Sequence, residues 1–447
     1  MSSADTIAAI ATPPGNGSIG IVRLSGPAAP AIAGALLGRP PRPRHAHFCR
    51  FLDPGGQAID HGLLIHFPAP HSFTGEHVVE LQAHGSPVAL RRLLARTVEL
   101  GARQARPGEF SERAFLNGRL DLAQAEAIAD LIAAGSEAAA RSAMRSLDGA
   151  FSHEVRAVTE ATIRLRIWIE AAIDFPEEEI DFLAAPELAK GFADLGAQVT
   201  AVLAGARRGT RLADGLHVVI VGRPNTGKSS LLNALAAAER AIVTDIPGTT
   251  RDVLRESIDL DGVALTLVDT AGLREADDRV EQEGIRRARA ELAKADVAIL
   301  VTDDVHAETD RALLQDLPAA ATRLIVHNKI DLDGLAPRSR IHDGALHLWL
   351  SAQTGAGLPL LTAELERLAG RGETGEGSYS ARARHVAALE RASASLQAAE
   401  SALIEARAGE LAAEELRQVQ HALGEITGEF SDEDLLGRIF ADFCIGK

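Results

Sequence analysis

The sequence has very little cysteine and no long apolar run. Only Cys49 and Cys444 occur in 447 residues, and they lie far apart along the chain. This argues against a disulfide framework and for a reducing compartment, so we expect a cytoplasmic protein. No apolar stretch reaches the ~20 residues that span a bilayer, and no basic segment precedes an apolar one at the N-terminus. We therefore expect no membrane segment and no signal peptide.

Positive charge is also scarce, since 46 lysines and arginines stand against 62 aspartates and glutamates, for a net charge of −16. Bulk electrostatics therefore do not favour nucleic acid, and any contact with RNA would need a local basic patch. The composition is otherwise ordinary for a soluble globular protein, at 46% hydrophobic and 24% charged. The length predicts roughly two to four domains.

Two stretches of the chain favour helices. In the first, apolar residues from Met144 to Ile169 recur at steps of three or four. This stripe predicts one long helix whose apolar side lies in a bundle core. In the second, Leu389, Leu396 and Leu403 are spaced seven apart. We predict one helical domain made from both stretches, interrupted by a domain of a different kind.

Short apolar runs between these stretches predict the strands of a parallel sheet. They are residues 216–221, 264–268, 297–301, 324–327 and 346–350. Near the N-terminus, residues 19–24 and 78–82 also predict strands. The string Gly15-Asn-Gly-Ser-Ile-Gly20 spells a dinucleotide-binding fingerprint, but it leads into a strand rather than a helix, so we reject that interpretation.

Residues 222–229 read Gly-Arg-Pro-Asn-Thr-Gly-Lys-Ser and are typical of a phosphate-binding loop. They follow an apolar strand and open a helix, which is the context that the motif requires. Gly222 and Gly227 let the backbone turn and approach the phosphates. Lys228 would place a cation at the β- and γ-phosphates, and the Ser229 hydroxyl would bind Mg²⁺.

Later motifs identify the base as guanine. Residues 328–331 read Asn-Lys-Ile-Asp. Asp331 can accept hydrogen bonds from N1–H and the 2-amino group of guanine, whereas adenine would leave this carboxylate unpaired at a large cost. Asn328 and Lys329 frame the base, and the Ser-Ala-Gln of residues 351–353 predicts a loop that closes over it. Upstream, the Asp-Thr-Ala-Gly of residues 269–272 predicts a contact with Mg²⁺ and the γ-phosphate.

The segment from Thr244 to Asp252 predicts a mobile switch, in which the Thr250 hydroxyl closes on Mg²⁺. Ras-like GTPases carry a glutamine after Asp-x-x-Gly that orients the attacking water, and here that position is Leu273. Another group must therefore orient the water, and chemistry alone does not choose it. The candidates in the following loop are Arg274, Glu275, Asp277, Asp278 and Glu281.

Together the motifs define the residues that we expect to contact GTP. They are Asn225, Thr226, Gly227, Lys228, Ser229, Ser230, Thr244, Asp245, Ile246, Pro247, Gly248, Thr249, Thr250, Asp269, Thr270, Ala271, Gly272, Asn328, Lys329, Asp331, Ser351, Ala352 and Gln353. We expect Lys228, Thr250 and Gly272 to act in catalysis, because each meets the γ-phosphate or its Mg²⁺.

Several strings resemble the MnmE (TrmE) family of tRNA-modification GTPases, of the TrmE-Era-EngA-YihA-Septin-like class. They are Thr249-Thr-Arg-Asp252, Leu273 in place of glutamine, the C-terminal Phe443-Cys-Ile-Gly-Lys447, and residues 107–117, 120–128 and 426–430. The resemblance covers the whole chain and implies an α/β multidomain fold. Its parts would be an α+β folate-binding and dimerisation domain (1–118), a split α-helical bundle domain (119–212 and 371–447) and an inserted Ras-like P-loop GTPase domain (213–370).

The resemblance also implies how GTP is hydrolysed. The family forms homodimers, and its two GTPase domains meet across their switches with K⁺ bound at the nucleotide. The implied K⁺ ligands are Asn225, Thr244, Ile246 and Thr249. An all-oxygen cation site of this kind could do the electrostatic work of an arginine finger. Glu281 matches the acid that orients the attacking water.

Chemistry on tRNA is implied as well. With a flavoprotein partner, MnmG, in a heterotetramer, the family adds an aminomethyl or carboxymethylaminomethyl group to C5 of the wobble uridine, using carbon from 5,10-methylene-tetrahydrofolate. The folate site, which would also take 5-formyl-tetrahydrofolate, would use Arg23, Glu80, Arg119 and Lys447. Cys444 is either a nucleophile or a packed thiol, and the amino donor is either glycine or ammonium.

Two other functions are compatible with a GTP site. One is an Era-like GTP switch in ribosome assembly, which needs an RNA-binding module that the acidic balance and the folate-type N-terminal half disfavour. The other is a dimeric scaffold whose nucleotide state sets only its conformation. Faster turnover of GTP in potassium than in sodium would distinguish the tRNA-modification enzyme from both.

Overall fold

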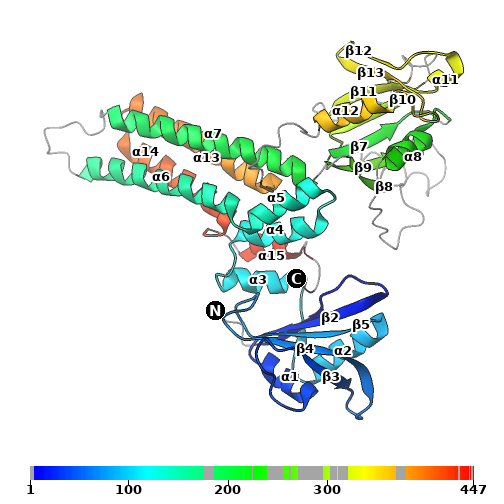
Figure 1. Ribbon diagram of the computed structural model, residues 1–447. Helices are drawn as coiled ribbons and strands as arrows, with labels where there is room; N and C mark the ends of the chain where they lie inside the picture. The colour runs from blue at the N-terminus through cyan, green and yellow to red at the C-terminus, as the bar shows by residue number, and fades with distance from the viewer. Residues whose placement is uncertain are drawn as a thin grey trace, which may run out of the picture. The chain divides into compact units, whose positions relative to one another are not determined.

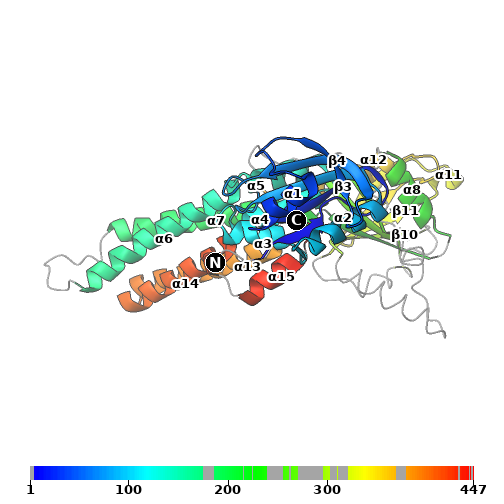
Figure 2. The ribbon, with the colours of Figure 1, turned by 90° about the horizontal axis from the view of Figure 1, so that it is seen from below.

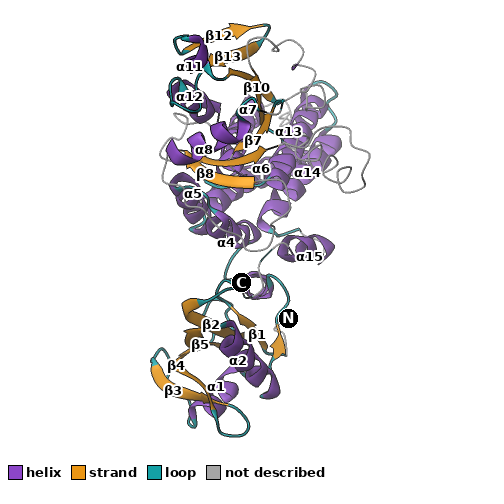
Figure 3. Cartoon of the chain, turned by 90° about the vertical axis from the view of Figure 1, so that its right-hand side faces the viewer, coloured by secondary structure: helices purple, strands orange, loops and turns teal. Residues whose placement is uncertain are grey.

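A computed structural model describes most of the chain. The described residues are 5–174, 186–214, 216–223, 225–238, 255–260, 263–269, 295–302, 310, 321–368, 379–430, 433–441, 443 and 446. The chain divides into two compact units, of which the first comprises Met1–Ala129, Val155–Ala189 and Ala394–Lys447 and the second Asp130–Glu154 and Lys190–Ser393. The described strands gather in two sheets (Figure 3). No described helix is both long enough and apolar enough to cross a membrane.

The first unit contains a six-stranded sheet in the order β3-β4-β5-β2-β1-β6, blue in Figure 1. Its strands are β1 (Ile7–Ile10), β2 (Gly17–Ser25), β3 (His47–Leu52), β4 (Ala58–Phe67), β5 (Val78–Gly85) and β6 (Arg103–Gln104). Neighbours pair antiparallel except β1 and β6, which are parallel. The strands expected at 19–24 and 78–82 are confirmed within β2 and β5, and Gly17 to Gly20 lie in a strand, which confirms that the fingerprint does not open a helix.

Two helices cover one face of this sheet, α1 (Ala29–Leu37) and α2 (Pro87–Glu99) (Figures 1 and 2). Val22 and Leu24 of β2 are fully buried beneath them. Because side chains alternate along a strand, Arg23 lies on the opposite face. There Phe110, from a third helix, packs on the alternate residues of β1. One sheet face is therefore a closed core, and the other carries the charged candidates.

Further helices that lie wholly or partly in the first unit include α3 (Glu109–Leu116), α4 (Leu122–Ala133), α6 (Ala150–Asp174), α14 (Gly409–Thr427) and α15 (Glu433–Ala441). A small cluster joins three of them, because Leu122, Phe440 and Phe443 pack together beside Phe115. The C-terminal segment is thereby fixed next to the first turn of α4, although Cys444 and Lys447 themselves lie outside the described residues.

The prediction of one long helix through Met144 and Ile169 is wrong. The stripe is shared by α5 (Glu137–Leu147) and α6, which are separate helices. Gly149 has a φ of 92°, and its N–H bonds to the carbonyl of Ser146, which ends α5. Glycine adopts this left-handed conformation without strain, so it commonly terminates helices. Met144, at the end of α5, is 44% exposed, whereas Ile169 is fully buried.

The second unit contains a seven-stranded sheet in the order β12-β13-β11-β10-β7-β9-β8. Its strands are β7 (Leu216–Val221), β8 (Arg255–Leu260), β9 (Val263–Asp269), β10 (Val297–Thr302), β11 (Thr322–His327), β12 (Arg338–His342) and β13 (Ala345–Trp349). The five expected strands are confirmed and pair in parallel. Two antiparallel edge strands, β8 and β12, were not expected. Every residue of β12 is exposed, so no apolar run reveals it.

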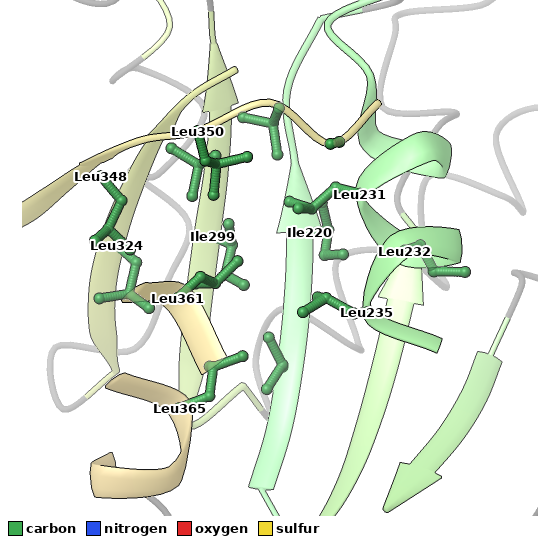
Figure 4. Packing of buried hydrophobic residues seen from close by; sticks show 14 of the residues in the cluster. Ile220, Leu231, Leu232, Leu235, Ile299, Leu324, Leu348, Leu350, Leu361 and Leu365 are labelled. Atoms are coloured by element: carbon green, nitrogen blue, oxygen red, sulfur yellow. The ribbon is translucent and has the colours of Figure 1, made fainter. Parts of the chain in front are cut away.

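The described helices of the second unit include α7 (Pro186–Asp214), α8 (Lys228–Ala238), α11 (Ile330–Asp333), α12 (Leu358–Leu368) and the first half of α13 (Ala383–Ile404). One apolar cluster holds α8 and α12 against the same face of the sheet, with Leu231 and Leu361 fully buried over Ile220 and Ile299 (Figure 4). The sheet order reverses direction between β7 and β10, and open α/β sheets bind ligands at such a switch point.

Candidate functional site

The phosphate-binding loop follows β7 at this switch point. Gly222 and Gly227 have φ values of 156° and 95°. A Cβ at Gly222 would collide with the Val301 carbonyl, and one at Gly227 with the Asn328 amide. Both positions therefore require glycine. Lys228 is 6% exposed, and its ammonium donates to the carbonyls of Gly222 and Arg223, at 3.0 Å each. The loop thus encloses the cation that we expect at the phosphates.

Asn328 connects this loop to the base-reading segments. Its Nδ2 donates to the Thr226 carbonyl at 2.8 Å, and its Oδ1 accepts from the Ala352 N–H at 2.9 Å. The side chain is only 8% exposed, so both bonds are shielded from water. One residue therefore joins three segments that are far apart in sequence. These segments follow the ends of β7, β11 and β13. The phosphate-binding loop and both base-reading segments are therefore joined at one buried side chain.

Lys329 and Asp331 occupy the outer side of the same corner. Lys329 adopts a φ of 68°, and its Nζ donates to the Asn225 carbonyl at 2.6 Å. Asp331 lies exposed in the short helix α11, and no described residue bonds to its carboxylate. Ser351 is fully buried and accepts from the Thr354 N–H at 3.2 Å, which shapes the loop that carries Gln353. The carboxylate is therefore accessible to a base beside a rigid loop.

A buried carboxylate at this site was not expected from the sequence. Asp310 is 1% exposed, pairs with the Arg223 guanidinium and accepts from the Thr302 hydroxyl at 2.8 Å. It therefore ties the phosphate-binding loop to the end of β10. The sequence signal was weak, because one aspartate in a polar stretch normally indicates surface.

Behind the base-reading segments, buried imidazoles stack across the sheet. His327 and His347 share a hydrogen bond of 2.9 Å, and the Trp349 ring stacks on His327 with centroids 4.4 Å apart. Because His327 precedes Asn328 and Trp349 precedes Leu350, this stack braces the two strands at the point where both base-reading segments begin.

Part of the expected site lies outside the described residues. This holds for the switch positions Thr244, Asp245, Ile246, Pro247, Gly248, Thr249 and Thr250, for Thr270, Ala271, Gly272 and Glu281, and for Cys444 and Lys447. Asp269 ends β9, next to β7. Ser229 and Ser230 open α8 with exposed side chains. Of the four expected K⁺ ligands, only Asn225 is described; it is exposed, with a φ of 64°.

The folate candidates lie in the first unit. Arg23 and Glu80 are directly opposite each other on β2 and β5, and Arg23 Nη2 lies 2.9 Å from Glu80 Oε1. The guanidinium is also 5.8 Å and 5.9 Å from the ring centroids of Phe73 and Phe110. The two side chains, 24% and 16% exposed, form a paired site on the open face of the sheet.

Arg119 contacts the loop that carries Phe73. Its side chain packs against Gly75, and the neighbouring Asn117 donates to the Thr74 carbonyl at 2.8 Å. Arg119 also lines a cavity of about 290 Å³ between the start of α4 and the end of α14. The loop from Phe73 to Gly75 therefore contacts both arginine candidates.

Comparison with protein families gives two matches. The model of the "GTP-binding protein TrmE N-terminus" matches residues 6–119, and that of the "MnmE helical domain" matches residues 122–444. Among curated proteins, the chain is 56% identical over 442 residues to the tRNA modification GTPase MnmE of Alkalilimnicola ehrlichii, covering 99% of each. It is 54% identical over 450 residues to that of Hydrogenovibrio crunogenus, covering 100% of each.

A solved structure similar to part of the chain is the G domain of the T. maritima FeoB iron transporter. The two are 26% identical over 34% of this chain and 98% of that one, with a TM-score of 0.27.

Proposed function

The chain belongs to the MnmE (TrmE) family of tRNA-modification GTPases, and from this premise we propose that its GTP hydrolysis serves the modification of C5 of the wobble uridine. It is a GTP hydrolase that acts in tRNA modification, with a multidomain α/β fold. The observation that supports the GTP assignment is the pair of buried hydrogen bonds that Asn328 makes, one donated to Thr226 and one accepted from Ala352, because they join the phosphate-binding loop to the base-reading loop.

We propose that hydrolysis uses Mg²⁺ and K⁺. Ser229 and Thr250 would hold Mg²⁺, and Asn225 with Thr244, Ile246 and Thr249 would supply the oxygen ligands that K⁺ requires. These donors suit hard cations. Lys228 and the N–H of Gly272 would stabilise charge on the γ-phosphate, and Glu281 would orient the water that Leu273 does not.

The finer chemistry is supported by family membership and by the paired charges on the N-terminal sheet. Glu80 would accept from the pterin edge of 5,10-methylene- or 5-formyl-tetrahydrofolate, and Arg23, Arg119 and Lys447 would bind its carboxylates. A homodimer joined to the flavoprotein MnmG in the cytoplasm would act on tRNA. The domain boundaries at 118, 212 and 370 and the role of Cys444 remain predictions.

The cation proposal is tested by steady-state GTP hydrolysis in KCl and in NaCl at equal ionic strength. We expect a rate at least about tenfold higher in KCl, because a bound cation replaces an arginine finger. Asn225→Ala should remove most of the difference between the two salts. Equal rates for the unaltered protein would refute the potassium site but leave the GTP site intact.

The tRNA proposal is tested by nucleoside analysis of tRNA from cells that lack this chain. The modified wobble uridine should disappear and return when the gene is restored. Restoration with Lys228→Ala should fail, because the loop cation is lost. Unchanged nucleosides together with a defect in ribosome assembly would favour the Era-like alternative.

A further inference from the structure

Charge is distributed unevenly between the two ends of the chain. The first 118 residues contain eleven arginines, no lysine and eight carboxylates, which gives them a net charge of +3. The chain as a whole has a net charge of −16, so the remaining residues carry −19. From residue 6 to residue 52 there are five arginines and no carboxylate at all. An acidic protein therefore has one locally basic region, which the bulk composition conceals. A polyanion would be attracted there rather than elsewhere.

Four of the five arginines between residues 6 and 52 lie along one edge of the N-terminal sheet. The exposed side chains of Arg39, Arg42, Arg44, Phe48 and Arg50 occupy the segment that leads into β3 and β3 itself, which is the edge strand. We call these five residues the basic edge. No carboxylate in the described part of the chain pairs with any of its four arginines. The carboxylates of the adjoining hairpin are otherwise committed, Asp53 to Arg92 and Asp60 to His84.

Neutral groups orient two of the arginines. Arg44 donates to the carbonyl of His71 and lies 5.8 Å from the centroid of the Phe67 ring. The Nε of Arg50 donates to Nε2 of His61 at 3.1 Å. These contacts fix the guanidinium groups without neutralising them, so each keeps its full charge and free N–H groups for an anion.

Phe48 projects from the same strand. It is 74% exposed, whereas Phe51 on the other face of the strand is fully buried. Its outer ring surface is open, and the His61 ring lies near it, with centroids 6.5 Å apart and an interplanar angle of 21°. Arginines alone on an edge strand could serve only to prevent strand pairing and aggregation. A large exposed aromatic ring between them defeats that purpose, so the edge requires another explanation.

We propose that the basic edge binds single-stranded RNA in the tRNA substrate, with the arginines at phosphates and an unpaired base stacked on Phe48. The inference rests on the proposed function, which supplies tRNA as the polyanion. Proteins recognise RNA loops by this combination, because unstacked bases offer a π-face and each phosphate offers a charge. The His61 imidazole extends the aromatic surface on the neighbouring strand β4.

The test is the affinity of the full-length protein for an unmodified transcript of a tRNA with uridine at the wobble position, measured by fluorescence anisotropy across KCl concentrations. Two charges are removed in Arg39→Gln/Arg42→Gln, so its affinity should fall about tenfold or more. The slope of log Kd against log [KCl] should also fall by about one to two units. Phe48→Ala should weaken binding about five- to hundredfold with an unchanged slope, because stacking releases no counterions.

Arg91→Gln is the matched control. Arg91 is exposed on α2, which packs on the opposite face of the same sheet, so the variant changes the domain's charge without touching the basic edge. It should bind the transcript almost as the unaltered protein does. An equal loss in Arg91→Gln would show that only bulk charge matters, and native affinity in the two edge variants would also overturn the proposal.

Further outcomes of these experiments distinguish RNA from other ligands of the basic edge, and failure of this proposal from failure of the proposed function. If Phe48→Ala halves the mass of the protein in solution and keeps its tRNA affinity, the edge is a contact between copies and the proposal fails. If the edge variants lose binding to phosphatidylserine vesicles but keep their affinity for tRNA, the edge binds a membrane and the proposal likewise fails. If the unaltered protein binds no transcript, yet cells without it lose the modified uridine, the proposed function stands and this surface does not.

Discussion

The nucleotide corner of the second unit and the open face of the N-terminal sheet are organised on different principles. At the nucleotide corner, polar side chains bind backbone: Lys228 and Asn328 donate to carbonyls, and Asn328 accepts from an N–H. On the N-terminal sheet, polar side chains bind one another, as Arg23 and Glu80 do across two strands. The first arrangement shapes loops around a ligand. The second neutralises each charge with a neighbouring side chain, so a ligand would have to break such a pair or add further bonds to it.

A charge network beside the N-terminal sheet shows the second principle most clearly. Glu109, 2% exposed, accepts from Arg103 at 2.5 Å and lies 3.3 Å from Arg113. Arg113 also pairs with buried Glu76 at 3.1 Å, and Glu76 accepts from Ser25 at 2.7 Å. These residues join β2 to α3, so nearly every charge here is used in a structural pair. At the nucleotide corner Asp310 is used in the same way, but the exposed Asp331 carboxylate has no partner among the described residues.

The largest effect is expected at the nucleotide corner, from Asp331→Asn. The variant loses the carboxylate that would accept from both guanine donors, so we expect the Kd for GTP to rise about 10²–10³-fold. The affinity for xanthosine triphosphate should rise, because its C2 carbonyl can accept from the new amide. Fluorescent-nucleotide competition measures both values.

Asp333→Asn is the control for this prediction, since Asp333 is exposed in the same short helix and carries the same charge. It should change the Kd for GTP less than about twofold. Unchanged selectivity for GTP in Asp331→Asn would contradict the prediction. The nucleotide corner would then have no accessible carboxylate that recognises the base, and its main difference from the N-terminal sheet would be lost.

A slightly smaller effect, on local stability, is expected in the N-terminal network. Burial alone would raise the pKa of Glu109, but the hydrogen bond from Arg103 and the backbone N–H of Arg106 hold it below its usual value. Its stabilisation is therefore complete above the unfolded pKa of ~4.3 and is lost as pH falls through the lower folded pKa. Glu109→Gln should cost about 3 kcal/mol at pH 7, because Arg103 and buried Arg113 both lose a buried charged partner.

Hydrogen exchange of peptides that cover β1 and α3 measures this cost, and we expect about a hundredfold faster exchange at pH 7. The difference from the unaltered protein should shrink as the pH is lowered below the folded pKa. Glu112→Gln, on the same helix but paired with exposed Arg106 at 2.9 Å, should cost under about 1 kcal/mol. Equal exchange in the two variants would contradict a structural role for the buried pair.

The same contrast explains what could be predicted from the sequence. The core strands of the second unit are short apolar runs, and the phosphate-binding and base-reading motifs are contiguous strings that follow such runs directly. Their positions at strand ends therefore followed from the pattern. The position of Asp310 beside Arg223 did not, because that pairing depends on how a distant segment folds.

Pairs between strands were harder still. Nothing in the sequence states that Arg23 and Glu80 are in register, because the pairing is set by the whole run of β2 against β5. The break between α5 and α6 had a local signal, Asp148-Gly149, but an apolar stripe continued across it and favoured one helix. The edge strand β12 had no apolar signal at all.

The smallest effect, and the sharpest test of the comparison, concerns the pair on the N-terminal sheet. Glu80→Gln keeps the shape of the side chain but removes its charge. We expect the affinity for 5-formyl-tetrahydrofolate, measured by calorimetry on the full-length protein, to fall about tenfold, because a charged acceptor gives the stronger hydrogen bond to a pterin. Stability should change by under about 1 kcal/mol, since the pair is partly exposed.

Asp53→Asn is the matched control, because Asp53 pairs with Arg92 at 3.0 Å near the same sheet and is similarly exposed, at 19%. Its loss should leave folate affinity unchanged. If Glu80→Gln and Asp53→Asn both bind folate normally, the Arg23–Glu80 pair is structural like the Glu109 network, and the charges on the open face do not bind the ligand. If only Glu80→Gln loses folate affinity, a paired side chain also recognises a ligand. Both regions then bind ligands, and they differ in whether the recognising carboxylate is already paired before the ligand arrives.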